Sequence, residues 1–181
     1  MPVTRRAAIR QFLYVSAGVL VIPSCLQDRS KASVLVKNFN ITIDEENVLS
    51  ELSETIIPKT DTPGAKDLSA YLFLLKMVDD CTSAEDQEKF VNGLRAFEKQ
   101  FEMKSGKSFV NASATQRSSV LPAMFSGDTK TDEVAAFLST VKRYTIQAYT
   151  ASSYFLTKVH PYELVPGRYQ GCVPVKANVT S

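Results

Sequence analysis

The sequence predicts an all-α protein, a compact bundle of about five helices followed by an irregular C-terminal tail. Apolar residues recur at intervals of three and four along most of the chain, which is the spacing of one helix face. No stretch of useful length alternates apolar and polar residues, as a half-buried strand would, and no internal repeat is present. With 181 residues, 44% of them hydrophobic and 22% charged, the chain has the size and composition of a single globular domain.

The first helix is expected to begin after Thr42. Thr42 and Glu45 have the spacing of a capping box, and Pro58 ends the run that follows. The helix-spaced apolar residues between them are Val48, Leu49, Leu52 and Ile56. The turn-forming residues of positions 59–65 then allow the chain to reverse direction.

A second, strongly apolar helix is expected to run to Asp80 and Cys81, through Leu68, Tyr71, Leu72, Leu75, Met77 and Val78. Ser83 can cap a third helix, and Gly106 can end it in the left-handed conformation that glycine tolerates. The apolar stripe of this third helix is Phe90, Val91, Leu94, Phe97 and Phe101.

Two further helices follow. Ser113 and Gln116 again have capping-box spacing, which introduces a short helix that should end near Gly127. The longest element is expected over positions 131–159, with an interruption at 151–153. Its one-sided stripe, which we interpret as core packing, is Val134, Phe137, Leu138, Val141, Tyr144, Ala148, Tyr149, Phe155, Leu156 and Val159. Two prolines and two glycines in positions 162–175 forbid a long helix in the tail.

Residues 1–24 have the pattern of an export signal, in which basic residues precede a short apolar run. The apolar run covers positions 12–22 and is shorter than the ~20 residues of a membrane span. Arg5 and Arg6 resemble the paired arginines of the twin-arginine signal, although Ala8 replaces the usual phenylalanine. The alternative is a general secretion signal in which these arginines only supply positive charge.

The segment from Ile22 to Cys25 resembles a bacterial lipobox, in which the cysteine is acylated and becomes the first mature residue. Cys25 would then anchor the protein to a membrane in the periplasm. The alternative is that Cys25 is an incidental thiol. We expect a polar tether over 25–43, a helical domain over 44–159 and the irregular tail over 160–181.

The remaining cysteines, Cys81 and Cys172, make an even number once Cys25 is acylated. An oxidising compartment favours a disulfide between them, and the alternative is two separately buried thiols.

The sequence lacks the residues that several kinds of functional site require. The single histidine, His160, cannot supply a multi-imidazole metal centre, and the seven glycines form no phosphate-binding pattern. From Cys25 onward 18 basic residues (21 − 3) stand against 19 acidic ones, which does not favour nucleic acid. The carboxylates at Asp44, Glu45 and Glu46, and at Asp79 and Asp80, are expected to be solvated. We therefore expect no cofactor on this chain and no independent enzyme activity.

A set of motifs nevertheless has a recognisable order and spacing. They are Leu52-Ser53-Glu54-Thr55-Ile56-Ile57-Pro58, Asp61-Thr62-Pro63-Gly64-Ala65, Asp80-Cys81, Gly106-Lys107-Ser108-Phe109 and Val165-Pro166-Gly167-Arg168-Tyr169-Gln170-Gly171-Cys172-Val173-Pro174. Together they resemble the gluconate 2-dehydrogenase subunit 3 family, the small subunits of periplasmic flavin-dependent sugar dehydrogenases. The resemblance implies a non-catalytic subunit that accompanies a large FAD-containing flavoprotein of the glucose-methanol-choline (GMC) type, often with a cytochrome c as electron acceptor. It also implies that the export signal serves the folded large subunit.

We expect the flavoprotein to dock on the C-terminal tail and on the turn from Asp61 to Ala65. The predicted docking residues are Asp61, Pro63, Gly64, Tyr162, Arg168 and Tyr169. Tyrosine and arginine dominate interface hot spots. One alternative is that the tail only covers the helical core, with its tyrosines packed inward. Another is that docking uses the exposed face of the long helix around Lys142, Arg143 and Gln147. Two other functions stay open: a stand-alone periplasmic lipoprotein that binds a sugar or envelope component, and an enzyme that uses Asp61, Asp79, Asp80 and His160.

Overall fold

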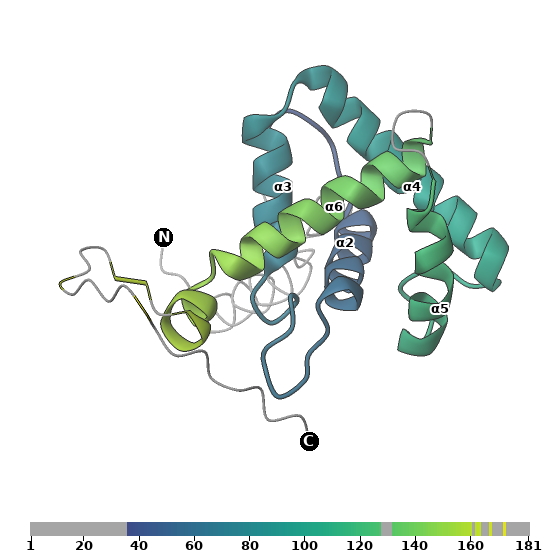
Figure 1. Cartoon of the computed structure of the whole chain (residues 1–181). Coiled ribbons are helices and arrows are strands. Elements are labelled where there is room, and N and C mark those ends of the chain that lie inside the picture. Colours follow the sequence, from purple (N-terminus) through teal and green to yellow (C-terminus); the bar gives the residue numbers. More distant parts are fainter. Residues whose placement is uncertain (1–35, 128–131, 161, 164–166, 168–171, 173–181) are drawn as a thin grey trace, which may run out of the picture.

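The computed structural model describes residues 36–127, 132–160, 162–163, 167 and 172. Over these residues the chain is helical and has no strand, which confirms the predicted all-α class. The elements are α2 (Ile43–Ile56), α3 (Ala70–Cys81), α4 (Ala84–Ser105), α5 (Ala114–Phe125), α6 (Glu133–Thr150) and the short π-helix η1 (Phe155–Val159). Helix α6 runs diagonally across the molecule and contacts every other helix named here (Figure 1).

Local capping interactions set most of the helix ends. The predicted capping box at α2 is present: the Thr42 hydroxyl accepts the Glu45 N–H at 3.2 Å, and the Glu45 carboxylate accepts the Thr42 N–H at 2.8 Å. Ser113 and Gln116 form the same pair at α5. Ser83 caps α4, and Gly106 ends it with a φ of 72°. These predicted boundaries are confirmed.

The long C-terminal element differs from the prediction. Helix α6 begins after Asp132 and ends at Thr150, so α4, with 22 residues, is the longest described helix. The Ser152 hydroxyl donates to the Tyr149 carbonyl at 2.6 Å and accepts the Phe155 N–H at 3.2 Å. Such side-chain bonds to the backbone compete with helical ones, which explains the expected interruption and the π-helical turn that follows.

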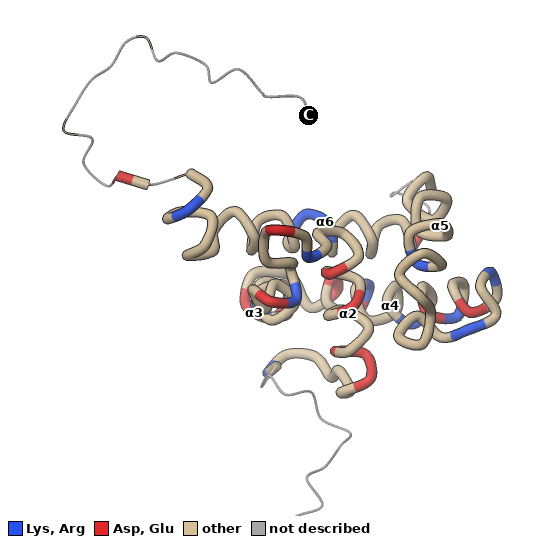
Figure 2. The backbone as a smooth tube through the Cα atoms, turned by 90° about the horizontal axis from the view of Figure 1, so that it is seen from below, with Lys and Arg blue, Asp and Glu red and all other residues tan. Residues whose placement is uncertain are grey.

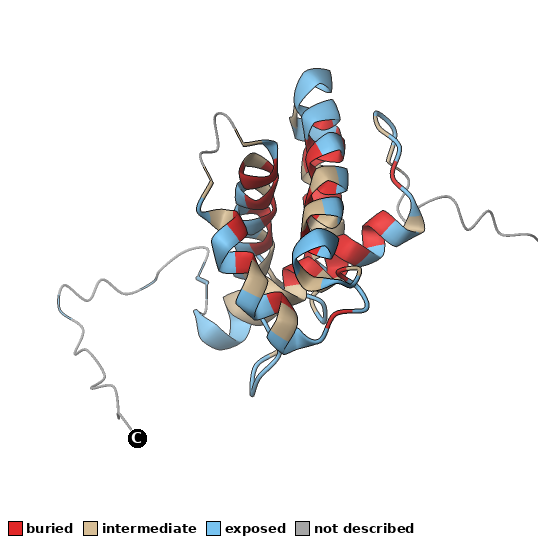
Figure 3. Ribbon diagram, turned by 90° about the vertical axis from the view of Figure 1, so that its right-hand side faces the viewer, coloured by how far each residue is buried: buried red, intermediate tan, exposed pale blue. Residues whose placement is uncertain are grey.

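The core lies where α6 crosses α2, α3 and α4, and Figure 3 shows the buried residues on the inner faces of these helices. Phenylalanines dominate it: the rings of Phe101 and Phe109 lie 4.8 Å apart, and those of Phe97 and Phe109 5.1 Å. The stripe of α6 is buried through Tyr144. Beyond Tyr144 the predicted core stripe is wrong, because Ala148, Tyr149, Phe155 and Leu156 are half-buried and Val159 is exposed.

A buried carboxylate fastens the segment before α2. Asp79 is 2% exposed, and its carboxylate accepts the backbone N–H groups of Lys37 at 3.1 Å and Asn38 at 2.9 Å. The expectation of solvated carboxylates is therefore wrong for Asp79. It is also wrong for Glu45 and Glu46, which are buried, whereas Asp44 and Asp80 are exposed. The backbone N–H groups replace the hydrogen bonds that water would make to the Asp79 carboxylate, and this offsets the cost of burying its charge.

The described helices include none whose length and apolar content would allow it to cross a membrane.

We predict that Asp79→Asn destabilises the protein by about 1–3 kcal/mol at pH 7, because the backbone N–H groups of Lys37 and Asn38 lose a charged acceptor. Burial alone would raise the pKa of Asp79, but the N–H groups of Asn38 and Lys37 outweigh it and hold the pKa below its ordinary value. A depressed folded-state pKa contributes stability above the unfolded-state value of ~3.9 that disappears as the pH falls through the folded-state value.

The difference in the free energy of unfolding between wild type and Asp79→Asn should therefore shrink as the pH falls from 7 to below the unfolded-state pKa of ~3.9. Urea unfolding across this range measures it. The exposed neighbour provides the control: Asp80→Asn removes only a surface ion pair with Lys76 and should have little effect. Equal effects of the two variants would contradict the role given to Asp79.

Candidate functional site

An apolar patch lies on the surface where α6 passes into η1. We call it the α6–η1 patch and define it as Ile146, Tyr149, Tyr154, Phe155, Leu156, Val159 and Tyr162. Ile146, Val159 and Tyr162 are 43%, 52% and 65% exposed, and the other four members are half-buried. Apolar side chains that gather at one place on a protein surface can mark a site of interaction.

The backbone of the α6–η1 patch is held in a defined shape. The Tyr149 ring makes edge-to-face contacts with the rings of Tyr154 and Phe155, at centroid distances of 6.4 and 6.2 Å. The His160 N–H donates to the Phe155 carbonyl at 2.8 Å, a π-helical bond, and the Tyr162 N–H donates to the Leu156 carbonyl at 2.9 Å. Pre-ordered aromatic side chains lose little entropy on binding, so this surface is suited to a protein partner.

A second structured surface is the loop over 57–69, which folds around the carboxylate of Glu54. This carboxylate accepts the backbone N–H groups of Lys59 at 2.8 Å and Lys66 at 2.9 Å. A Cβ atom at Gly64 would lie 2.4 Å from a Glu54 oxygen, so any other residue here would displace the Glu54 carboxylate from this position. We name this segment the Glu54 loop.

The sequence places Glu54 in the motif from Leu52 to Pro58, but no role for its side chain was predicted. Its position could have indicated one, because an acidic residue in the last turn of a helix interacts unfavourably with the helix dipole. Such a residue therefore suggests a stabilising contact elsewhere. The structure supplies that contact, because Glu54 organises the turn that connects α2 to α3.

The predicted docking residues are distributed unevenly. Tyr162 belongs to the α6–η1 patch, and Asp61 is exposed on the Glu54 loop. Pro63 is half-buried and Gly64 is buried, so Gly64 shapes the loop and offers no contact surface. The Glu54 loop and η1 lie at the same end of the molecule (Figure 1). Arg168 and Tyr169 lie outside the described residues.

Lysine, arginine, aspartate and glutamate are interspersed along the described helices, as Figure 2 shows. The acid-base candidates are divided by their surroundings. Asp79 lies near the C-terminal end of α3, and its carboxylate accepts the backbone N–H groups of Lys37 and Asn38. Asp61 lies in the loop before α3, and His160 is exposed after η1. Among the described residues, no group of three or more His, Cys, Asp or Glu side chains could hold a metal ion.

The cysteine predictions have mixed outcomes. Cys81 and Cys172 are free and exposed in the structure, so the alternative of two buried thiols is wrong. The disulfide between them is not formed here and stays a prediction for the exported protein. Cys25, like Arg5 and Arg6, lies outside the described residues.

Comparison with known proteins gave one match. The model of a family described as gluconate 2-dehydrogenase subunit 3 matches residues 43–167. The matched region holds all the helices named here, the Glu54 loop and the α6–η1 patch. No curated protein and no solved structure matches the chain.

We predict that Glu54→Ala opens the Glu54 loop, because two backbone N–H groups lose their acceptor. The expected cost is about 1–2 kcal/mol of folding free energy. Trypsin should also cut faster after Lys59 and Lys66, and mass spectrometry of a time course would locate the cuts.

The control is Glu88→Ala, which removes an exposed glutamate from α4. It should leave both the unfolding transition and the cleavage rate at these lysines as in the wild type. If Glu54→Ala behaves like this control, Glu54 does not organise the loop.

Proposed function

The chain belongs to the gluconate 2-dehydrogenase subunit 3 family, and on that basis we propose that it is the non-catalytic small subunit of a periplasmic sugar or polyol dehydrogenase complex. Its partner is a large flavoprotein of the GMC type, which holds the FAD and carries out the oxidation. A cytochrome c that accepts the electrons completes the complex. This chain itself holds no cofactor.

The observation that carries the proposal is the α6–η1 patch. A subunit needs a surface that faces water in the free protein and is covered by the partner in the complex. The α6–η1 patch combines two exposed aliphatic residues with three aromatic rings that pack against one another. Tyrosine is enriched at the energetic centres of protein interfaces because its ring gives a large rigid contact at small entropy cost. In the sequence, Arg168 and Tyr169 follow Tyr162 by six and seven positions.

We further propose that the small subunit supplies export, maturation and membrane attachment to the complex. The paired Arg5 and Arg6 direct the folded complex to twin-arginine transport, which explains why a helical domain without cofactor motifs would have a signal for folded cargo. Acylated Cys25 then anchors the complex. Lys37, whose backbone N–H binds the Asp79 carboxylate, follows Cys25 by 12 positions, which corresponds to a reach of up to ~40 Å between the lipid and this point of the chain.

We predict that Val159→Asp weakens binding of the large subunit by about 30-fold, because a charge enters an apolar contact. Val159 is 52% exposed, so the fold should tolerate the change. The readout is the flavin absorbance of protein copurified with the tagged chain, followed by titration of the separated subunits. Replacing Arg168 and Tyr169 together by alanine should also weaken binding.

Met103→Asp is the matched control, because Met103 is 71% exposed near the C-terminal end of α4. That end of α4 lies far from η1 (Figure 1). Met103→Asp should bind the flavoprotein normally. Circular dichroism and thermal unfolding should be alike for both variants. Normal binding by Val159→Asp would show that docking does not use the α6–η1 patch, and the absence of any flavoprotein with the wild type would contradict the proposed function.

We predict that changing Arg5 and Arg6 together to lysine keeps the charge but leaves both subunits in the cytoplasm, as cell fractionation and immunoblotting would show. Undiminished delivery would instead indicate general secretion. A second variant, Cys25→Ala, should still be exported but should leave the membrane fraction. Unchanged membrane association of Cys25→Ala would exclude the lipid anchor.

A further inference from the structure

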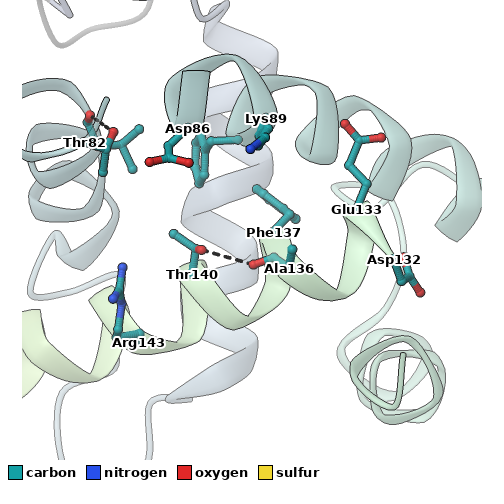
Figure 4. A pocket seen from close by; sticks show the side chains of 11 residues that line it. Thr82, Asp86, Lys89, Asp132, Glu133, Ala136, Phe137, Thr140 and Arg143 are labelled. Atoms are coloured by element: carbon teal, nitrogen blue, oxygen red, sulfur yellow. Dashed lines mark hydrogen bonds between the residues drawn. The ribbon is translucent and has the colours of Figure 1, made fainter. Parts of the chain in front are cut away.

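A pocket of about 560 Å³ opens on the side of α6 that faces α3 and α4. Its apolar surface comes from Val78, Phe90, Ala136 and Phe137, and its polar residues are Thr82, Asp86, Lys89, Asp132, Glu133, Thr140 and Arg143. We name it the α4–α6 pocket. In Figure 4, Arg143 and Glu133 rise from α6 at opposite ends of the pocket, and Asp86 and Lys89 project from α4 between them.

The pocket results from the way α4 and α6 cross. At Gly93 the helices are so close that a Cβ atom would lie 2.7 Å from the Phe137 Cβ and 3.1 Å from the Glu133 carbonyl oxygen. From this crossing α4 runs away from α6 toward its own N-terminus, where Asp86 and Lys89 face the later turns of α6. The wedge between the diverging helices is the pocket.

Most charges around the pocket are already engaged. Lys89 pairs with Glu85 at 2.7 Å, Asp86 accepts the Ser83 hydroxyl at 2.8 Å, and Asp132 caps the N-terminus of α6. Arg143 is different. Its guanidinium lies 4.5 Å from the centre of the Tyr144 ring and pairs with no carboxylate among the described residues.

The chemistry of the pocket selects its occupant. A guanidinium beside an apolar surface suits a carboxylate next to an apolar side chain, since the planar fork can bind both carboxylate oxygens. Three acidic residues around the pocket against two basic ones disfavour a polyanion or an anionic lipid surface. Ile146 follows Arg143 by three positions, so the pocket and the α6–η1 patch lie along the same helix without interruption.

We propose that the α4–α6 pocket receives a segment of the large subunit, which places an apolar side chain on Phe90 and Phe137 and a carboxylate on Arg143. The inference rests on the proposed function and extends the docking surface from η1 along α6. The contact would give the Arg143 guanidinium a carboxylate partner, which it lacks among the described residues, and so would add charge specificity to the apolar attraction of the patch.

The first test is Arg143→Glu in the full-length chain, titrated with the flavoprotein that copurifies with the wild type. Affinity should fall by about 30-fold, because a repulsive pair replaces an attractive one. Lys142→Glu is the matched control. Lys142 is the adjacent cation, lies 5.7 Å from the centre of the Phe125 ring and does not line the pocket, so its reversal should change affinity little.

The second test identifies the occupant directly. A photo-crosslinking benzoylphenylalanine in place of Lys89, an exposed residue of the pocket, should capture a peptide of the large subunit that contains Asp or Glu beside an apolar residue. A captured peptide without an acidic residue, or capture of this chain alone, would overturn the inference. So would equal affinity of Arg143→Glu and wild type.

These outcomes separate the inference from the proposed function. If the wild type binds the flavoprotein and Val159→Asp does not, while Arg143→Glu binds normally, the small-subunit function stands and the pocket is not part of the interface. If the wild type binds no flavoprotein, both are overturned.

Discussion

The packing of α6 against the other helices is the interaction on which the structure depends. Helix α6 contacts α2, α3, α4 and α5, and its buried residues from Val134 to Tyr144 supply one side of the core. It comes close to α4 where Gly93 faces Phe137 without an intervening side chain. Because α6 is shared by all these contacts, its position determines both the core and the surfaces on either side of it.

The apolar stripe of α6 extends beyond the helices that cover it. Up to Tyr144 the stripe is core, and after Tyr144 the same periodicity continues into residues that no described element buries completely. Edge-to-face contacts around Tyr149 and the π-helical turn hold this uncovered part in place. A helix that is core at one end and presents an ordered apolar surface at the other is what a small docking subunit requires.

Carboxylates fasten the irregular segments to the helices. Asp79 holds the segment before α2, Glu54 holds the loop after it, and Glu51 binds both Lys66 and Arg117. Arg117 in turn donates to the carbonyls of Phe109 and Val110 and so fixes the connection between α4 and α5. Burial opposes ionisation at Glu51, yet its hydrogen bonds to Lys66 and Arg117 outweigh that effect and lower its pKa. The attachments made by Asp79 and Glu51, whose pKa values are both lowered, therefore operate with the carboxylates ionised.

The sequence by itself determined the helices and most of their ends, because a cap such as Thr42 with Glu45, or Gly106 after α4, acts within one turn of the chain. It also carried the motifs that indicate the family. Only the tertiary structure decided which carboxylates are buried, since Asp79 meets Lys37 across 42 positions, and where the stripe of α6 loses its cover. The docking prediction for Tyr162 came from residue type, whereas the α6–η1 patch, the α4–α6 pocket and the role of Glu54 depend on how helices distant in sequence pack together.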